Sequence, residues 1–209
     1  MSADPHVVFL PGAAGAPEFW APVAERLPAG WTKVLLSWPG AGEQPHDPSV
    51  RGFEDLLALA AASLADAPSD LVAQSMGGAV AVALALRHPE RVRRLVLAAT
   101  SGGIDVQRLG AADWRADYRR EYPAAAPWIS APWPDHADAL GRVRAPTLLL
   151  WGDADPISPL AVGERLAELL PGSVLRVIAG GGHDFAHEQP GVVASMIAAH
   201  LGEDIGGAR

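Results

Sequence analysis

Short apolar runs and helical patterns alternate along almost the whole chain, and this alternation constrains the fold more than any other feature. Most of the apolar runs are bounded by Gly, Pro, Ser or Asp, which is typical of strands buried on both faces of a sheet. Alternation of this kind implies βαβ units. We therefore predict an α/β fold with a mainly parallel sheet of about six strands and helices on both faces.

The predicted elements follow from this pattern. The strands are expected at His6–Leu10, Lys33–Ser37, Leu71–Ala73, Arg94–Ala98, Thr147–Trp151 and Val174–Ile178. The helices are expected at about Pro17–Leu27, Val50–Ala65, Met76–Arg87, Leu160–Leu170 and Pro190–Leu201. A chain of 209 residues can bury roughly 70% of its unfolded surface, which is enough for one α/β domain or at most two small ones, and we predict a single domain over residues 1–209. The tail after Leu201 is expected to fray.

One segment, Ile104–Arg142, interrupts the alternation. It has several prolines and no strand pattern, and its aromatic residues are Trp114, Tyr118, Tyr122, Trp128 and Trp133. Two interpretations stay open. The segment is either a short helical excursion over one end of the sheet, which makes it a small cap insertion, or a surface connection whose aromatic side chains pack on the domain.

Composition excludes several classes of function. The net charge is −8 and the acidic residues are scattered, whereas phosphate binding needs clustered Lys and Arg, so we expect no nucleic-acid partner. The lack of cysteine excludes disulfides, thiolate metal sites and a cysteine nucleophile, and it fits the cytoplasmic location that we expect. The N-terminus has no basic region of a secretory signal, and no apolar run reaches the length of a membrane span.

A serine stands at an abrupt corner between a strand and a helix. The apolar run Leu71–Ala73 is followed almost at once by a helical pattern, and Ser75 lies between them. Ligands bind at the carboxyl ends of parallel strands, and a tight turn there exposes its middle side chain if the neighbours are small, as Ala73 and Gly77 are. The amide of Met76 then lies at a helix N-terminus, where it favours an anion. Alternatively, Ser75 caps the helix and the glycines permit close helix packing.

The sequence AQSMG, residues 73–77, resembles the nucleophile elbow of the α/β-hydrolase fold, which normally reads G-x-S-x-G. Here Ala, which is also small, replaces the first Gly. The family orders its catalytic triad as Ser, acid and His, and candidates occur in that order in this chain. The resemblance extends from His6 to Leu201 and implies the α/β-hydrolase fold, with Ser75 as the nucleophile.

The acid and the base are assigned by the same resemblance. The stretch TLLLWGDADPISP is similar to the family's strand followed by G-x-x-D, which implies that Asp155 is the acid, with Asp153 as its competitor. The stretch VIAGGGHDFAHEQP resembles the loop after the last strand, where a His follows glycines, and this implies that His183 is the base. The alternative base is His187, which otherwise caps or decorates the last helix.

The family takes its second oxyanion donor from the loop after the first strand, which here reads LPGAAG. The matching position is Ala13, and its backbone N–H is expected to act together with that of Met76. The family's usual His-Gly is replaced by Pro11-Gly12, which leaves a backbone donor in place.

The resemblance implies a carboxylesterase-like serine hydrolase that cleaves a small, largely apolar ester through an acyl-enzyme, without a metal or cofactor. A thioesterase or a carbon–carbon bond hydrolase or lyase would use the same triad, and some members are non-catalytic small-molecule receptors. We expect a pocket built from Phe19, Trp20, Trp128 and Trp133 to prefer small neutral acyl groups, because the sequence offers no evident cationic clamp. The sequence leaves the natural substrate and the oligomeric state open.

Overall fold

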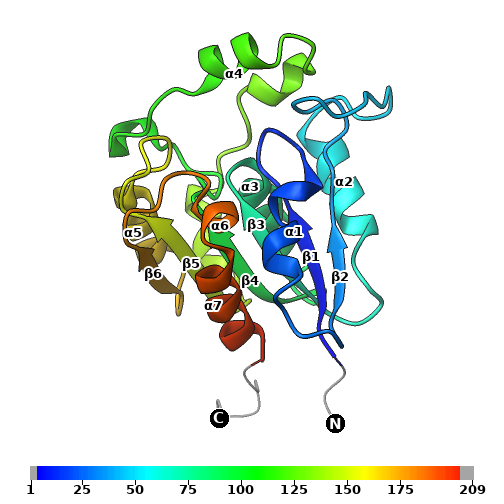
Figure 1. Ribbon diagram of the computed structural model, residues 1–209, viewed down its shortest axis with the longest axis vertical. Coiled ribbons are helices and arrows are strands. Elements are labelled where there is room, and N and C mark those ends of the chain that lie inside the picture. Colours follow the sequence, from blue (N-terminus) through cyan, green and yellow to red (C-terminus); the bar gives the residue numbers. More distant parts are fainter. Residues whose placement is uncertain (1–3, 203–209) are drawn as a thin grey trace.

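In the computed structural model, which describes residues 4–202, the strands form one parallel sheet in the order β2-β1-β3-β4-β5-β6 (Figure 1). The strands are β1 (His6–Leu10), β2 (Thr32–Leu35), β3 (Ser69–Gln74), β4 (Val92–Ala98), β5 (Thr147–Gly152) and β6 (Val174–Ile178). The α-helices are α1 (Ala21–Ala24), α2 (Phe53–Ala62), α3 (Met76–Arg87), α4 (Arg115–Glu121), α5 (Leu160–Leu169), α6 (Phe185–Glu188) and α7 (Pro190–Gly202). Short 3₁₀ turns occupy Pro17–Phe19, Gln107–Leu109, Pro127–Ser130 and Ala137–Arg142.

The predicted parallel sheet is confirmed, and β1 and β6 have the predicted bounds. The strand β3 is longer than predicted because its ends carry the buried polar residues Ser69, Asp70 and Gln74, which an apolar pattern does not include. The predicted helix at Pro17–Leu27 is wrong in length, since the chain forms a 3₁₀ turn and then the four-residue α1. The predicted frayed tail falls mainly on residues 203–209, outside the described part of the chain.

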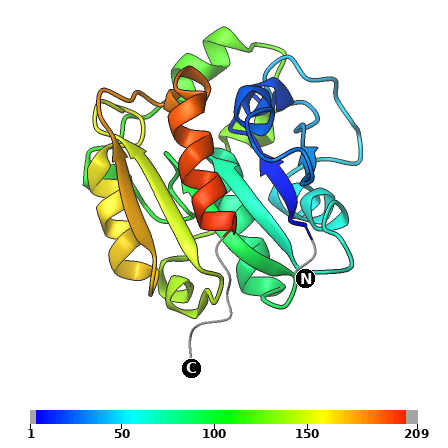
Figure 2. The same cartoon turned by 60° about the horizontal axis from the view of Figure 1, so that its bottom comes forward.

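The strands divide their side chains between two cores, because successive side chains of a strand point to opposite faces. In β1, Val8 and Leu10 belong to one apolar cluster, whereas Val7 and Phe9 belong to the other. The first cluster receives the buried faces of α2, α3 and α5, and the second receives those of α1, α6 and α7. Figure 2 shows α7 lying across its face of the sheet. The all-apolar strands of the sequence therefore reflect burial on both sides.

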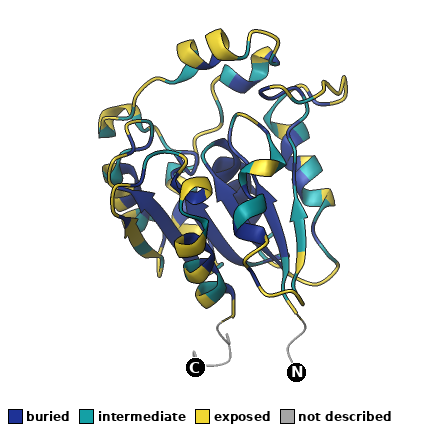
Figure 3. Cartoon of the chain, in the orientation of Figure 1, coloured by how far each residue is buried: buried dark blue, intermediate teal, exposed yellow. Residues whose placement is uncertain are grey.

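The carboxyl edge of the sheet has a topological switch point at β1 and β3. The chain after β1 enters α1 on one face, and the chain after β3 enters α3 on the other face. Connections that leave toward opposite faces open a crevice between them, which is where ligands bind in sheets of this type. The 104–142 segment passes over this edge (Figure 1), and much of it is exposed, in contrast to the buried strands below it (Figure 3).

None of the helices within residues 4–202 combines the length and the hydropathy that a bilayer-crossing segment needs.

Candidate active site

Ser75 occupies a strained corner between β3 and α3. Its backbone angles are φ 50° and ψ −120°, and among the described residues only Ala99, at the end of β4, is another non-glycine with positive φ. The Ser75 N–H donates to the carbonyl of Ala98 (3.0 Å), and its carbonyl accepts a hydrogen bond from Thr100 Oγ1 (2.5 Å). Strained backbone costs on the order of 1–3 kcal/mol and persists where its surroundings hold it, often at functional sites.

Two glycines make this corner possible. A Cβ atom on Gly77 would lie 2.5 Å from the carbonyl oxygen of Pro11 and 2.6 Å from that of Leu10. A Cβ atom on Gly78 would lie 2.3 Å from Thr100 Oγ1. The helix therefore begins in direct contact with the end of β1 and with the segment after β4, which brings the loop after β1 close to Ser75.

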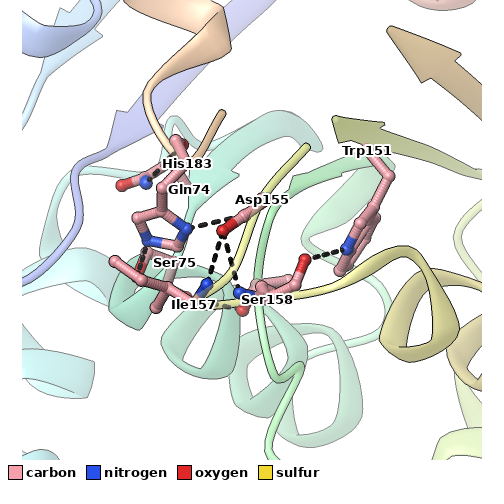
Figure 4. A network of polar contacts seen from close by, with 8 residues as sticks. Gln74, Ser75, Trp151, Asp155, Ile157, Ser158 and His183 are labelled. Atoms are coloured by element: carbon pink, nitrogen blue, oxygen red, sulfur yellow. Dashed lines mark hydrogen bonds and ion pairs between the residues drawn. The ribbon is translucent and has the colours of Figure 1, made fainter. Parts of the chain in front are cut away.

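A continuous chain of hydrogen bonds joins the three residues that the sequence singled out (Figure 4). Ser75 Oγ lies 3.0 Å from His183 Nε2, and His183 Nδ1 lies 2.8 Å from Asp155 Oδ2. Each residue follows the end of a different strand, namely β3, β5 and β6. The parallel sheet therefore brings together side chains that lie up to 108 positions apart in the sequence.

The carboxylate of Asp155 is held in one orientation by its own loop. Its side chain is fully buried, and Oδ1 accepts hydrogen bonds from the N–H groups of Ile157 (2.8 Å) and Ser158 (3.0 Å). Oδ2 therefore faces His183 and accepts the Nδ1 proton. An imidazole that carries its proton on Nδ1 presents an unprotonated Nε2 to the serine hydroxyl. This is the arrangement that a general base requires.

The two competing residues lie elsewhere. Asp153 Oδ1 accepts a hydrogen bond from the N–H of Gly180 (2.6 Å), so this carboxylate braces the loop after β6. His187 lies in α6, a helix that the sequence pattern did not predict, and its Nδ1 lies 3.1 Å from the carbonyl oxygen of Phe19. The hydroxyl of Ser75 bonds to His183 and to neither of these two residues.

The loop after β1 is held at several points along its backbone. The N–H of Gly15 donates to the Gly12 carbonyl (3.0 Å), and the indole of Trp38 donates to the Pro11 carbonyl (2.7 Å). Within residues 4–202 the N–H groups of Ala13 and Met76 donate to no protein acceptor. Both groups therefore remain available to an oxyanion, and their role as the donor pair stays a prediction.

A tyrosine from the 104–142 segment connects that segment to the same loop. The hydroxyl of Tyr118 donates to the Ala13 carbonyl (2.9 Å) and accepts a hydrogen bond from the N–H of Gly42 (2.8 Å). Burial raises the pKa of Tyr118, so the hydroxyl keeps its proton and can donate it. This carbonyl belongs to Ala13, the residue whose own N–H is the expected second donor to the oxyanion.

Two cavities meet at the serine. The large cavity, about 320 Å³, lies beneath the 104–142 segment, and its apolar walls include Ala79, Ile104, Ile129 and Trp133. The small cavity, about 220 Å³, lies between the loop after β1 and α4. Both are lined by Ser75 and His183, so a substrate bound across the serine can place one part in each.

The predicted pocket residues separate into two groups. Phe19 lines the small cavity and Trp133 lines the large one. The prediction that Trp20 lines the pocket is wrong. Its side chain is completely buried in the apolar cluster that α1, α6 and α7 share, and its indole donates to the Leu10 carbonyl (3.1 Å). Trp128 is also corrected, since it packs against the core cluster and lines neither cavity.

Three residues near the site were missed by the sequence reasoning. Thr100 supports the Ser75 carbonyl, Gln74 donates to the His183 carbonyl (3.4 Å), and Tyr118 supports Ala13. A polar residue two positions after the end of strand β4 was an available signal for Thr100. No local signal marks Tyr118, because its partner lies 105 positions away.

The described residues contain no group of three or more His, Cys, Asp or Glu side chains placed to hold a metal ion.

Two family models match the chain. A model of the alpha/beta hydrolase fold matches residues 5–137, and a model of an alpha/beta hydrolase family matches residues 105–196. Together the two matches cover residues 5–196, which include the 104–142 segment.

Similar proteins include two kinds of bacterial hydrolase. A pimeloyl-[acyl-carrier protein] methyl ester esterase of Neisseria meningitidis (strain H44/76) is 32% identical over 205 residues, which is 76% of this chain and 78% of that protein. A 2-hydroxy-6-oxononadienedioate/2-hydroxy-6-oxononatrienedioate hydrolase of Paraburkholderia phymatum is 26% identical over 242 residues, 92% of this chain and 84% of that protein. The solved structure of a thermophilic esterase from Thermogutta terrifontis superimposes with a TM-score of 0.74 at 24% identity, covering 96% of this chain and 90% of that one.

Proposed function

The chain belongs to the α/β hydrolase family and is a carboxylesterase-like hydrolase, and on this premise we propose that Ser75, His183 and Asp155 form its catalytic triad. The observation that carries the proposal is the unbroken set of hydrogen bonds from Ser75 Oγ through His183 to a buried carboxylate. A helix cap requires no such chain, because a capping serine bonds to the backbone of its own helix. Ser75 makes no side-chain cap hydrogen bond to α3.

In the first half of the proposed reaction, Ser75 Oγ bonds to the ester carbonyl carbon while its proton passes to His183 Nε2. The carbonyl oxygen becomes an oxyanion, which the N–H groups of Ala13 and Met76 stabilise. One such donor contributes about 10²- to 10³-fold to turnover. The carbon–oxygen bond to the alcohol then breaks, and the alcohol leaves with the proton from His183.

In the second half, a water molecule gives its proton to His183 Nε2 and its oxygen bonds to the acyl carbon. The second oxyanion uses the same donors. Its collapse breaks the bond to Ser75 Oγ, which regains the proton, and releases the carboxylic acid. Asp155 accepts the Nδ1 hydrogen bond throughout and stabilises the imidazolium that forms twice.

An ester is favoured over a dicarboxylate carbon–carbon substrate by the charges around the cavities. Among residues 4–202, Arg115 is the single Lys or Arg side chain that lines either cavity, and it forms an ion pair with Asp113 (3.1 Å). The carbon–carbon hydrolase relatives act on compounds named as dioates, which carry two carboxylates. A doubly anionic substrate would find no free cation here, whereas an uncharged ester needs none. The apolar walls of the large cavity suit a small, largely apolar group.

The experiment that tests the proposal combines labelling with turnover. A fluorophosphonate probe should label wild-type protein at Ser75, as read by peptide mass spectrometry, and the protein should hydrolyse short-chain aryl esters. Ser75→Ala should abolish both. Labelling of Ser75→Ala at the wild-type rate would show that the serine is not the nucleophile. Absence of any labelling in the wild type would favour a ligand receptor of the same fold.

A further inference from the structure

The small cavity has an aromatic wall that comes mainly from one helix. Trp114, Tyr118 and Tyr122 are spaced by four residues along α4 and its ends, so they lie in one row on the helix surface. The ring centroids of Trp114 and Tyr118 are 5.4 Å apart, and those of Tyr118 and Tyr122 are 5.1 Å apart. Phe19 adds a fourth ring from the other side of the cavity. Ser75 and His183 also line this cavity, so a ligand bound in it lies next to the proposed nucleophile.

A row of carboxylates lies beside the aromatic row. Asp117 and Glu121 are also four residues apart on α4, and both line the small cavity together with Asp184. All three residues are exposed, and no Lys or Arg of the described part of the chain lines this cavity. An acidic residue followed by an aromatic residue therefore occurs twice, four positions apart, as Asp117-Tyr118 and Glu121-Tyr122. All four residues line the small cavity.

Of the basic residues of α4, Arg115 and Arg119 contact residues other than the three cavity carboxylates, whereas Arg120 pairs with one of these carboxylates. Arg120 pairs with Asp117 (2.6 Å), with both side chains more than 70% exposed, so water and salt screen this pair. Arg119 donates to Ser130 Oγ (3.2 Å). Arg115 pairs with Asp113, lies over the ring of Trp114 at 5.5 Å from its centroid, and lines the large cavity. His187 is near Phe19 but does not line the small cavity.

Nearby carboxylates contribute to the pKa of one of the aromatic side chains, Tyr122. Burial, together with the hydrogen bond and charge of Glu121 and the charge of Glu43, raises the pKa of Tyr122 to about 12. A neighbourhood that resists the formation of a phenolate is one in which negative charge is unfavourable. Burial, the largest of these causes, disfavours a charge of either sign, whereas the carboxylates of Glu121 and Glu43 favour a positive one.

We propose that the small cavity binds a cationic, ammonium-bearing part of the substrate, next to the proposed nucleophile. This inference rests on the proposed function and adds the substrate class to it. Aromatic faces attract ammonium groups through their quadrupole, and a cleft lined with carboxylates raises the local concentration of cations. The other part of the substrate is uncharged and occupies the large cavity, whose inner walls are apolar.

Matched pairs of esters test the proposal, because each pair differs only in charge. One pair is butyrylcholine and its carbon isostere, in which a tert-butyl group replaces the trimethylammonium group. The second pair places the same two groups at the end of the acyl chain of a methyl ester. We expect kcat/KM to be about tenfold higher for the cationic member of one pair, and the pair that shows it identifies whether the small cavity takes the alcohol or the acyl part. The preference should weaken between about 20 mM and about 500 mM NaCl.

Charge-matched variants assign the preference to the cavity. In the triple variant Asp117→Asn, Glu121→Gln, Asp184→Asn, the ratio of kcat/KM values within the discriminating pair should fall about tenfold. The control triple variant Glu25→Gln, Asp66→Asn, Glu164→Gln removes three exposed carboxylates that line neither cavity, and its ratio should equal that of the wild type. An equal fall in both triple variants would assign the effect to the overall charge of the protein and overturn the proposal.

A binding measurement separates this inference from the proposed chemistry. Phenyltrimethylammonium should bind to Ser75→Ala protein in isothermal titration calorimetry, and binding should weaken in the acidic-row triple variant but not in the control triple variant. If the fluorophosphonate probe labels Ser75 and both ester pairs show a ratio near one, the proposed function stands and the cationic subsite is wrong. If phenyltrimethylammonium binds as expected and no labelling occurs, the subsite stands and the proposed catalysis is wrong.

Discussion

The carboxyl edge of the sheet and the 104–142 segment above it hold their side chains in different ways. At the sheet edge, Asp155 is held by backbone N–H groups of its own turn, Ser75 is held by backbone hydrogen bonds to Ala98 of β4 and to Gly78, and the strands beneath them are buried on both faces. The 104–142 segment contains one helix of seven residues and three 3₁₀ turns, and many of its side chains are exposed. We therefore expect the chemistry to depend on the sheet edge, and the choice of substrate to depend on the 104–142 segment.

Tyr118 joins these two regions. It is one of the few buried residues of the segment, and its hydroxyl forms hydrogen bonds with the loop after β1 and the loop after β2. If the two regions are functionally separate, variants of the sheet edge should affect turnover and variants of the segment should affect selectivity. The following predictions are ordered from the largest expected effect to the smallest.

The largest effect is expected at the serine and its base. Ser75→Ala and His183→Ala should each lower kcat by about 10⁶, and the double variant should be no worse, because the two residues act as one unit. His187→Ala is the control and should keep most of the activity. Steady-state rates on a short-chain aryl ester provide the measurement. An inactive His187→Ala with an active His183→Ala would refute the assignment of the base.

Asp155→Asn should lower kcat by about 10⁴, because an amide no longer holds the Nδ1 proton of His183 and the wrong tautomer faces the serine. Asp153→Asn should lower it far less, since that carboxylate binds the N–H of Gly180 instead. Circular dichroism should show both variants folded. A larger loss in Asp153→Asn would mean that the wrong carboxylate has been chosen.

Tyr118→Phe tests the connection between the two regions. Removing one donor from an oxyanion hole costs about 10²- to 10³-fold, so loosening the residue that carries a donor should cost less, about 10- to 100-fold in kcat. KM for a neutral ester should change little, and the affinity for a trifluoromethyl ketone inhibitor should fall in parallel with kcat. Tyr122→Phe, which removes a hydroxyl that does not contact the loop after β1, is the matched control. A change in KM alone would make Tyr118 only a part of the cavity wall.

Trp133→Ala should change selectivity without changing the chemistry. Its ring lies on the wall of the large cavity, so its removal should raise kcat/KM for longer acyl chains relative to short ones by a few-fold. Trp128→Ala is the control, because this residue packs on the core and lines neither cavity. Fluorophosphonate labelling of Ser75 should persist in both. Identical chain-length profiles in the wild type and Trp133→Ala would count against this cavity as the acyl site.

The smallest effect concerns the stability of the segment at low pH. Burial lowers the pKa of His136 from its ordinary value of 6.5, so the folded protein holds the neutral imidazole while the unfolded chain binds the proton more readily. The stability that this residue contributes is therefore present above pH 6.5 and lost as the pH falls through the lowered pKa. Tm measured from pH 8 to about pH 5 should fall less steeply in His136→Gln than in the wild type. An equal slope would show that His136 does not titrate in this range.

Much of the sheet edge could be predicted from sequence because its features are local. The six strands were found from short apolar runs, which in the four inner strands reflect burial on both faces, and the sharp corner at Ser75 requires small residues within two positions of it. Asp155 and His183 were found through motifs that lie directly after strands. The parallel arrangement then brings the ends of those strands together, so the approximate meeting of the three side chains follows from topology.

The 104–142 segment could not be predicted in the same way. Its irregular turns have no period, and its aromatic residues look alike in sequence, yet Trp133 lines a cavity and Trp128 does not. Trp20 was expected to line the pocket and instead fills the core, because the short α1 turns its indole toward Leu10. Which face a side chain takes in such a segment depends on what packs against it.

The parallel sheet and the strained corner follow from the sequence alone, because periodicity and turn chemistry are properties of neighbouring residues, and the resemblance to the α/β-hydrolase family identified the three residues whose side chains meet at this corner. Three further features appear only in the packed fold: the space around Ser75 is divided into two cavities, Tyr118 supports the loop of Ala13, and α4 directs its aromatic and acidic rows to the smaller cavity. These features depend on contacts between segments about a hundred residues apart, such as the 105 positions between Tyr118 and Ala13. No local pattern specifies such contacts, because the free energy that selects them comes from the packing of the whole chain.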